Sequence, residues 1–191
     1  MAIVTAADVL GFWFGDPPVT EPREAWFRKD AAFDTQIRER FGDTLQAALQ
    51  GGLRDWDATP AGALARIVVL DQFTRNAFRD TPRAFAGDAL ALAAAAAMTD
   101  SGTDLRVTPL QRWFVYLPFE HAEDLAAQER ALQLFGRLAS DAPPLADALE
   151  WAKKHHVVIA RFGRFPHRNA VLGRPDTPDE TAFLRQPGSR F

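Results

Sequence analysis

Residues 59–76 have the sequence TPAGALARIVVLDQFTRN, and this stretch decides the fold class. It opens with Thr59-Pro60, in which the threonine hydroxyl suits a helix N-cap and the proline suits the first helical turn. Four consecutive apolar residues follow at 67–70. A helix that is apolar on every side is typical of the centre of a fold. We therefore expect a central helix over residues 60–78.

The same start signal recurs at Thr81-Pro82, Thr108-Pro109 and Thr177-Pro178. Alanine and leucine together number 53, against 14 valines and isoleucines, a ratio that favours helix over sheet. We expect one all-α domain over residues 1–191, built as an irregular array of antiparallel helix pairs. The expected helices span residues 6–14, 21–28, 31–49, 60–78, 82–99, 109–117, 120–139, 144–164 and 178–185.

Composition excludes several classes of protein. The 191 residues include no cysteine, so disulfides, cysteine-bound metals and thiol nucleophiles are excluded. The longest stretch without a charged residue is the eleven residues Ala89 to Thr99, too short for a membrane span. The N-terminus lacks the pattern of a secretory signal, and we expect a cytoplasmic protein. A net charge of −3 argues against non-specific nucleic-acid binding.

Polar side chains interrupt the apolar faces of three expected helices. In the helix expected over residues 60–78, the apolar run is followed directly by the polar residues Asp71, Gln72, Arg75 and Asn76. Because a buried charge must be paired, we expect Asp71 and Arg75 to bond to other helices. A helical projection of 120–139 turns His121 and Gln128 inward, and the same projection of 150–165 places His155 on the apolar face. We expect the two histidines to meet at one wall of a cavity, although a histidine on an apolar face is more often a bonded core residue.

Basic side chains concentrate near the C-terminus. Residues 161–191 hold six arginines and three acids. We expect Pro166 to stop the last long helix and to turn the donors after it back toward the cavity. Arg161 and Arg164, one turn apart, would then reach the same ligand from the helix. The alternative is that these arginines only cap helix ends and cross-link the fold.

Three motifs resemble a known family: LDQFTRN at 70–76, YLPFEHAEDLAAQER at 116–130 and HHVVIARFGRFPHRNAVLG at 155–173. With Trp26-Phe27, Phe33-Asp34, Phe85 and Asp88, they are similar to the bacterial domain of unknown function 924 over about residues 8–185. The family usually has proline at Thr74, an apolar residue at Glu120 and serine at Ala122. The resemblance implies a tetratricopeptide-like helical fold and no established activity.

Known catalytic patterns are absent, including a phosphate loop, HExxH and GxSxG. The sequence therefore predicts no cofactor, although a mononuclear metal site at His121, Glu123 and His155, or an acid/base pair of a histidine with Asp71 or Glu123, stays open. Converging guanidinium, imidazole and amide donors favour an anionic small molecule or a peptide carboxylate as ligand. The alternatives are a hydrolase or transferase acting on an anionic metabolite, and a peptide-binding scaffold; the oligomeric state is not predicted. The candidate binding residues are Asp71, Gln72, Arg75, Asn76, His121, Glu123, Gln128, His155, Arg161, Arg164, His167, Arg168 and Asn169.

Overall fold

The computed structural model describes residues 2–16 and 18–189, and these residues form helices and no strand. The expectation of an all-α chain is confirmed. The α-helices are α1 Ala6–Phe14, α2 Ala31–Leu49, α3 Pro60–Val68, α4 Thr74–Ala77, α5 Asp88–Asp100, α6 Pro109–Glu120, α7 Leu125–Asp141, α8 Asp147–Phe162, α9 Asn169–Leu172 and α10 Pro178–Leu184. Short 3-10 turns precede or join several of them, at Glu24–Trp26, Arg54–Ala58, Pro82–Phe85, Thr103–Arg106, Pro143–Leu145 and Pro166–Arg168.

Side-chain caps start the helices largely where the sequence indicates. Thr59, Thr108 and Thr177 cap α3, α6 and α10, each accepting a hydrogen bond from the third backbone N–H of its helix. The helix expected at 82–99 is wrong in its first six residues. Thr81-Pro82 opens only a 3-10 turn, and α5 begins at Asp88. Thr81 does not act as an N-cap, because its hydroxyl donates to the Phe78 oxygen at 2.7 Å instead of accepting a bond from the turn. Gly87, the residue before α5, packs so closely on the central helix that a Cβ would lie 2.0 Å from the backbone oxygen of Leu70.

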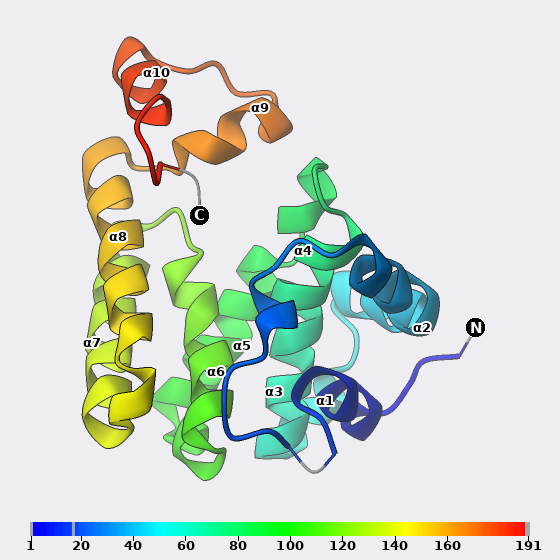
Figure 1. Cartoon of the computed structure of the whole chain (residues 1–191). Helices are drawn as coiled ribbons and strands as arrows, with labels where there is room; N and C mark the ends of the chain where they lie inside the picture. The colour runs from blue at the N-terminus through cyan, green and yellow to red at the C-terminus, as the bar shows by residue number, and fades with distance from the viewer. Residues whose placement is uncertain (1, 17, 190–191) are drawn as a thin grey trace.

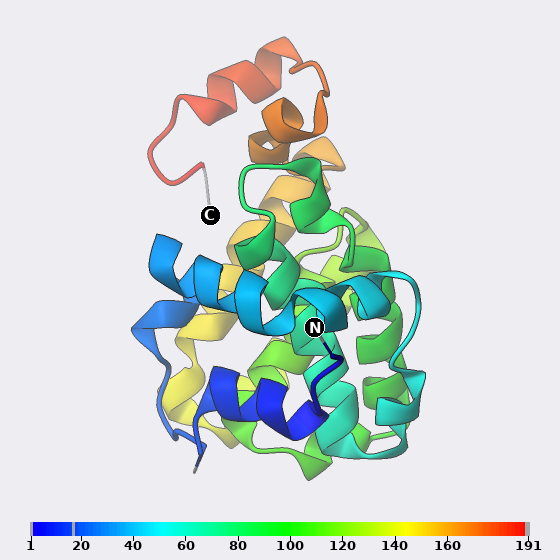
Figure 2. The same ribbon diagram turned by 90° about the vertical axis from the view of Figure 1, so that its right-hand side faces the viewer.

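The central helix runs from Pro60 to Ala77, as expected, but contains a π-helical turn at Val69–Phe73 between α3 and α4. α3 packs against α1, α5 and α6, so it has neighbours on every side. Figure 1 shows this helix behind α1, and Figure 2 shows α1 and α2 crossing in front of it. Leu64, Ile67 and Val68 are fully buried in the main core.

The second half of the chain forms the α6, α7 and α8 layer, in which α7 packs against both neighbours. Figure 1 shows α7 and α8 side by side, with α9 and α10 above the end of α8. A smaller apolar cluster joins Val158, Ile159 and Phe165 to Phe162 and Phe183 of this C-terminal region. The helix pairs differ in length, so a tetratricopeptide-like superhelix stays a prediction, as does the single-domain organisation.

Three expected boundaries are wrong. α6 continues through Pro118 to Glu120, because the proline sacrifices only one N–H near the helix end. α7 then begins at Leu125 after the Asp124 cap, so His121 is the C-cap of α6 rather than part of α7. The expected helix 21–28 is only the 3-10 turn Glu24–Trp26. Among the described residues, no helix is long and apolar enough to cross a membrane.

Candidate functional site

The π-helical turn widens the central helix where its polar residues begin. Asp71 and Gln72 lie within this turn and are buried. Thr74 donates a hydrogen bond to the Leu70 oxygen at 2.8 Å, which satisfies an acceptor that the wider turn leaves in the helix. Such π-turns are frequent at functional sites.

Asp71 binds His121 across two elements. The His121 Nδ1 lies 2.8 Å from Asp71 Oδ1 and 3.1 Å from Oδ2. Gln72 donates to Oδ2 at 2.6 Å, and Arg75 Nη1 lies 3.0 Å from Oδ1. The carboxylate acts only as an acceptor, so it fixes the proton of a neutral His121 on Nδ1. The Nε2 atom, which has no hydrogen-bond partner among the described residues, then carries the lone pair.

Asp88 holds two guanidinium groups. Arg75 binds its carboxylate through Nη1 at 2.8 Å and Nη2 at 3.1 Å, and Arg168 Nη1 lies 3.3 Å from it. Arg168 also donates to the backbone oxygen of His121 at 3.0 Å. The Arg168 guanidinium lies 4.6 Å from the Phe85 ring centroid and 4.5 Å from that of Phe165. Its buried Nε has no hydrogen-bond partner in the described part of the chain.

The second histidine, His155, lies next to a different carboxyl group. His155 Nδ1 lies 3.1 Å from Glu120 Oε1 and 2.9 Å from the Trp151 oxygen. The His155 and His121 ring centroids are 6.2 Å apart, and both side chains are mostly buried. The structure therefore brings the two histidines together, as the sequence predicts.

Burial and neighbouring charges set the protonation of this cluster. Burial alone would raise the pKa of Asp71, but Arg75 and His121 outweigh it and hold that pKa well below its ordinary value. Burial and Arg75 lower the pKa of His121. Burial lowers the pKa of His155 to about 3, and burial with the Asp71 charge raises the pKa of Glu120 to about 8. At neutral pH both imidazoles and Glu120 are therefore uncharged, while Asp71 is ionised.

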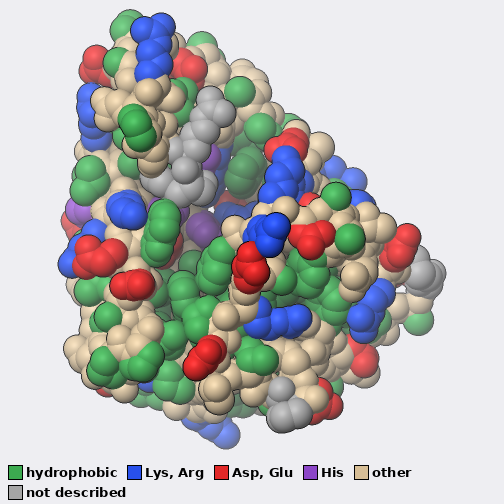
Figure 3. Space-filling view, viewed as in Figure 1, with side chains coloured by type: hydrophobic (Ala, Val, Ile, Leu, Met, Phe, Trp, Pro, Cys, Tyr) green, Lys and Arg blue, Asp and Glu red, His purple; other side chains and the backbone are tan. Residues whose placement is uncertain are grey.

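Figure 3 shows a hollow in this face of the molecule, with histidine and basic side chains visible in it. We call this feature the hollow, and the polar cluster is Asp71, Arg75, Asp88, His121 and Arg168. Arg75, Asp88 and His121 keep 20%, 21% and 15% of their side-chain surface exposed. Arg168 keeps 7%.

Other predicted residues are engaged elsewhere. Asn76 donates to Asp34 at 2.8 Å, facing α2. Gln128 donates to three backbone oxygens at the end of α6, including Glu120 at 2.6 Å, and so holds the turn that carries His121. Glu123 accepts from the Phe165 N–H at 2.8 Å and from Arg174.

Asn169 also has a local role, because it donates to Asp176 at 2.7 Å and accepts from Arg174 at 2.9 Å. His167 packs near Phe165, with ring centroids 5.5 Å apart.

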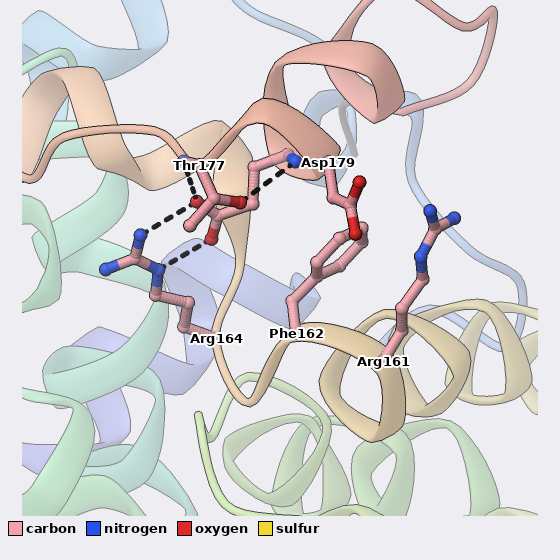
Figure 4. Close-up of a pocket in the computed structure, with 6 residues that line it drawn as sticks. Arg161, Phe162, Arg164, Thr177 and Asp179 are labelled. Atoms are coloured by element: carbon pink, nitrogen blue, oxygen red, sulfur yellow. Dashed lines mark hydrogen bonds and ion pairs between the residues drawn. The ribbon is translucent and has the colours of Figure 1, made fainter.

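Arg161 and Arg164 lie away from the polar cluster. They line a shallow depression of about 510 Å³ next to α10, together with Phe162, Thr177, Asp179 and Glu180. Figure 4 shows both oxygens of one carboxylate bonded to the Arg164 guanidinium. This carboxylate belongs to Glu180, which accepts from Nε at 2.6 Å and from Nη2 at 2.8 Å. The expectation that Arg164 continues the helix is wrong, because Gly163 ends α8 with a φ of 70°. The binding role of both arginines stays a prediction.

Sequence reasoning missed Asp88, Phe85, Glu120 and Arg174 as site partners. Asp88 and Phe85 belong to the motifs that carry the family resemblance, and that signal was available. Arg174 follows the Gly173 cap, and nothing in its spacing indicates that it pairs with Glu123. Among the described residues, no group of three or more histidine, aspartate or glutamate side chains has an arrangement that suits a metal ion.

Comparison with known proteins gives a family and a fold relative. No curated protein matches this chain. A solved structure, that of a protein of unknown function from Agrobacterium tumefaciens, is 42% identical, covering 94% of this chain and 96% of that one with a TM-score of 0.84. The model of the bacterial proteins of unknown function called DUF924 matches residues 9–188. The chain therefore belongs to the DUF924 family.

Proposed function

We propose that the hollow binds an anionic small molecule, with its acidic group at Arg168 and Arg75. The observation that carries this proposal is the incomplete pairing of Arg168. Its guanidinium shares the Asp88 carboxylate with Arg75, and its buried Nε has no acceptor among the described residues. A buried donor without a partner costs about 1–3 kcal/mol, and a ligand oxygen would recover it.

Electrostatics support the same conclusion. Burial, followed by the charge of Arg75, lowers the pKa of Arg168 to about 10. The charged form of this guanidinium is thus under-compensated in the fold, and a further anion would stabilise it.

Neighbouring aromatic groups suit the remainder of a small molecule. Phe85 lies against both guanidinium groups, with ring centroids 4.6 Å from Arg168 and 5.8 Å from Arg75. This ring is partly exposed, so an apolar or planar portion of the ligand can pack on it.

The test is isothermal titration with succinate and with sulfate for the wild type, Arg168→Lys and Arg28→Lys. We expect Arg168→Lys to weaken binding at least about tenfold, because lysine keeps the charge but has no donor in the place of Nε. Arg28→Lys is the matched control, because the Arg28 side chain is 69% exposed and pairs with Glu24 at the surface, and it should bind as the wild type does.

Should the wild type bind neither anion at millimolar concentration, the proposal is wrong, and the peptide-binding scaffold becomes the better hypothesis. Equal weakening by the two variants would also contradict it, because the effect would then not be specific to Arg168. Melting temperatures measured beside each titration show whether Arg168→Lys is folded, and a ligand that binds the folded state must raise them.

A further inference from the structure

We propose that the hollow is a hydrolytic active site, in which His121 activates water to cleave a carboxylic ester that carries a separate carboxylate. This inference rests on the proposed anion binding and names the substrate class and the reaction of the same site. His121 is the catalytic residue, because its Nε2 would touch the water, and Asp71 is the residue that positions it.

The geometry of the Asp71–His121 pair fits a general base. The carboxylate holds Nδ1 at 2.8 Å, which fixes both the tautomer and the ring orientation. Nε2 then presents its lone pair, and the side chain retains 15% of its surface exposed. The pKa of His121 is lowered by burial and by Arg75, so the imidazole is free to accept a proton at neutral pH.

No serine or threonine hydroxyl bonds to His121 in the described part of the chain, and the sequence has no cysteine. Thr74, the hydroxyl of the same helix, donates to the Leu70 and Asp71 oxygens instead. The base therefore acts on water rather than on a side-chain nucleophile. Direct attack by water is a single displacement, and no covalent intermediate with the protein forms.

The step balances without another reactant. His121 Nε2 takes a proton from water while the water oxygen forms a bond to the ester carbonyl carbon. Arg168 holds the separate carboxylate of the substrate, so the negative charge that develops on the carbonyl oxygen is stabilised by the Arg75 guanidinium. The bond from that carbon to the alcohol oxygen then breaks, and the proton passes from His121 to the leaving alkoxide, giving a carboxylate and an alcohol.

Charge selects a monocarboxylate over a phosphate. In the polar cluster, two guanidinium charges at Arg75 and Arg168 face two carboxylates at Asp71 and Asp88. Glu120 behind them is uncharged below its raised pKa of about 8. One further carboxylate can be accommodated by Arg168, and a second carboxylate at the far end of a chain, as in succinate, can lie in solvent. A phosphate monoester dianion would instead place both of its charges on one group in the buried site.

The probe is mono-4-nitrophenyl succinate, an activated ester with one free carboxylate, and the readout is release of nitrophenolate. We expect saturable hydrolysis by the wild type and a loss of about 10²–10⁴-fold in kcat for His121→Gln, the usual contribution of a general base. Arg28→Lys, at an exposed surface pair, should hydrolyse the probe at the wild-type rate. Neutral 4-nitrophenyl butyrate should show a much higher KM.

Two further measurements separate the possible failures. Succinate binding without hydrolysis would overturn this inference alone, and absence of succinate binding would overturn the proposed function itself. Hydrolysis that persists in folded His121→Gln would assign the activity elsewhere. If that variant does not fold, the wild-type pH profile decides, because a base of lowered pKa gives a plateau of kcat above pH 6.5, whereas a rate that keeps rising with hydroxide contradicts it.

Discussion

Substituting Asp71 by asparagine removes the charge at the centre of the polar cluster with little change in volume. The carboxylate is fully buried and receives hydrogen bonds or ion pairs from Gln72, His121 and Arg75. Breaking one partner of a buried charge pair costs about 3–5 kcal/mol. We expect about 3 kcal/mol, the low end, because Arg75 keeps its two contacts with Asp88.

Urea denaturation at pH 7 measures this loss in the free energy of unfolding. The matched control is Asp80→Asn, since Asp80 pairs with Lys29 at 2.9 Å while 74% of its side chain is exposed. An exposed pair contributes about 1 kcal/mol or less. Equal losses in the two variants would refute the buried network.

The free energy of unfolding at low pH gives a second test of Asp71→Asn. The folded-state pKa of Asp71 lies below its unfolded value, so the stability from its ionised form is present above about pH 4. That stability is lost as pH falls toward the folded-state value. We therefore expect Asp71→Asn to lose less stability than the wild type between about pH 4 and pH 2.

Three further variants test other parts of the structure. Gly87→Ala should destabilise the fold by about 1–3 kcal/mol or more in urea melts, because its Cβ would meet a backbone oxygen 2.0 Å away. Gly42→Ala, in open space, should be neutral or stabilising, and equal effects of the two variants would contradict the close packing at Gly87. The wild type should lose stability as pH rises from about 4.3 to 8, because the raised pKa of Glu120 means that the folded state favours its neutral form. Glu120→Gln should not show this loss, and identical pH profiles of the two proteins would contradict the burial of that carboxyl. Arg164→Gln should speed proteolytic cleavage within residues 174–189, because the two hydrogen bonds from Arg164 to Glu180 hold α10 in place. The unfolding transition of the core should not change, and unchanged cleavage would show that other contacts hold α10.

The sequence predicted much of the fold because its start signals are local. A capping side chain and a proline act within one turn, so Thr59, Thr108 and Thr177 begin helices as expected. Thr81 has the same signal, but its hydroxyl donates to the Phe78 oxygen instead of capping, and α5 begins only at Asp88. Periodicity alone does not reveal such a hydrogen bond, nor the π-helical turn of the central helix.

The sequence also predicted part of the candidate site. The apolar run before Asp71 and Arg75 predicts their burial, and helical projection predicts that of His155. Asp71 does pair with Arg75 and His121, and the His155 ring centroid lies 6.2 Å from that of His121. His121 meets them from the end of α6 rather than from α7, so its inward position was expected for the wrong helix. The partners of Arg168 depend on how a loop folds back after Pro166, and spacing along the chain carries no information about Asp88, 80 residues away.

The ring nitrogens of His121 test the central claim most directly. Long-range proton–nitrogen NMR of the wild type at pH 7 reports which nitrogen carries the proton, before and after addition of succinate. We expect a neutral ring with its proton on Nδ1 and a bare Nε2 in the free protein, and a changed chemical shift of Nε2, which stays unprotonated, when succinate binds. A proton on Nε2 in the free protein, or two nitrogen signals that do not change at saturating succinate, would contradict the account.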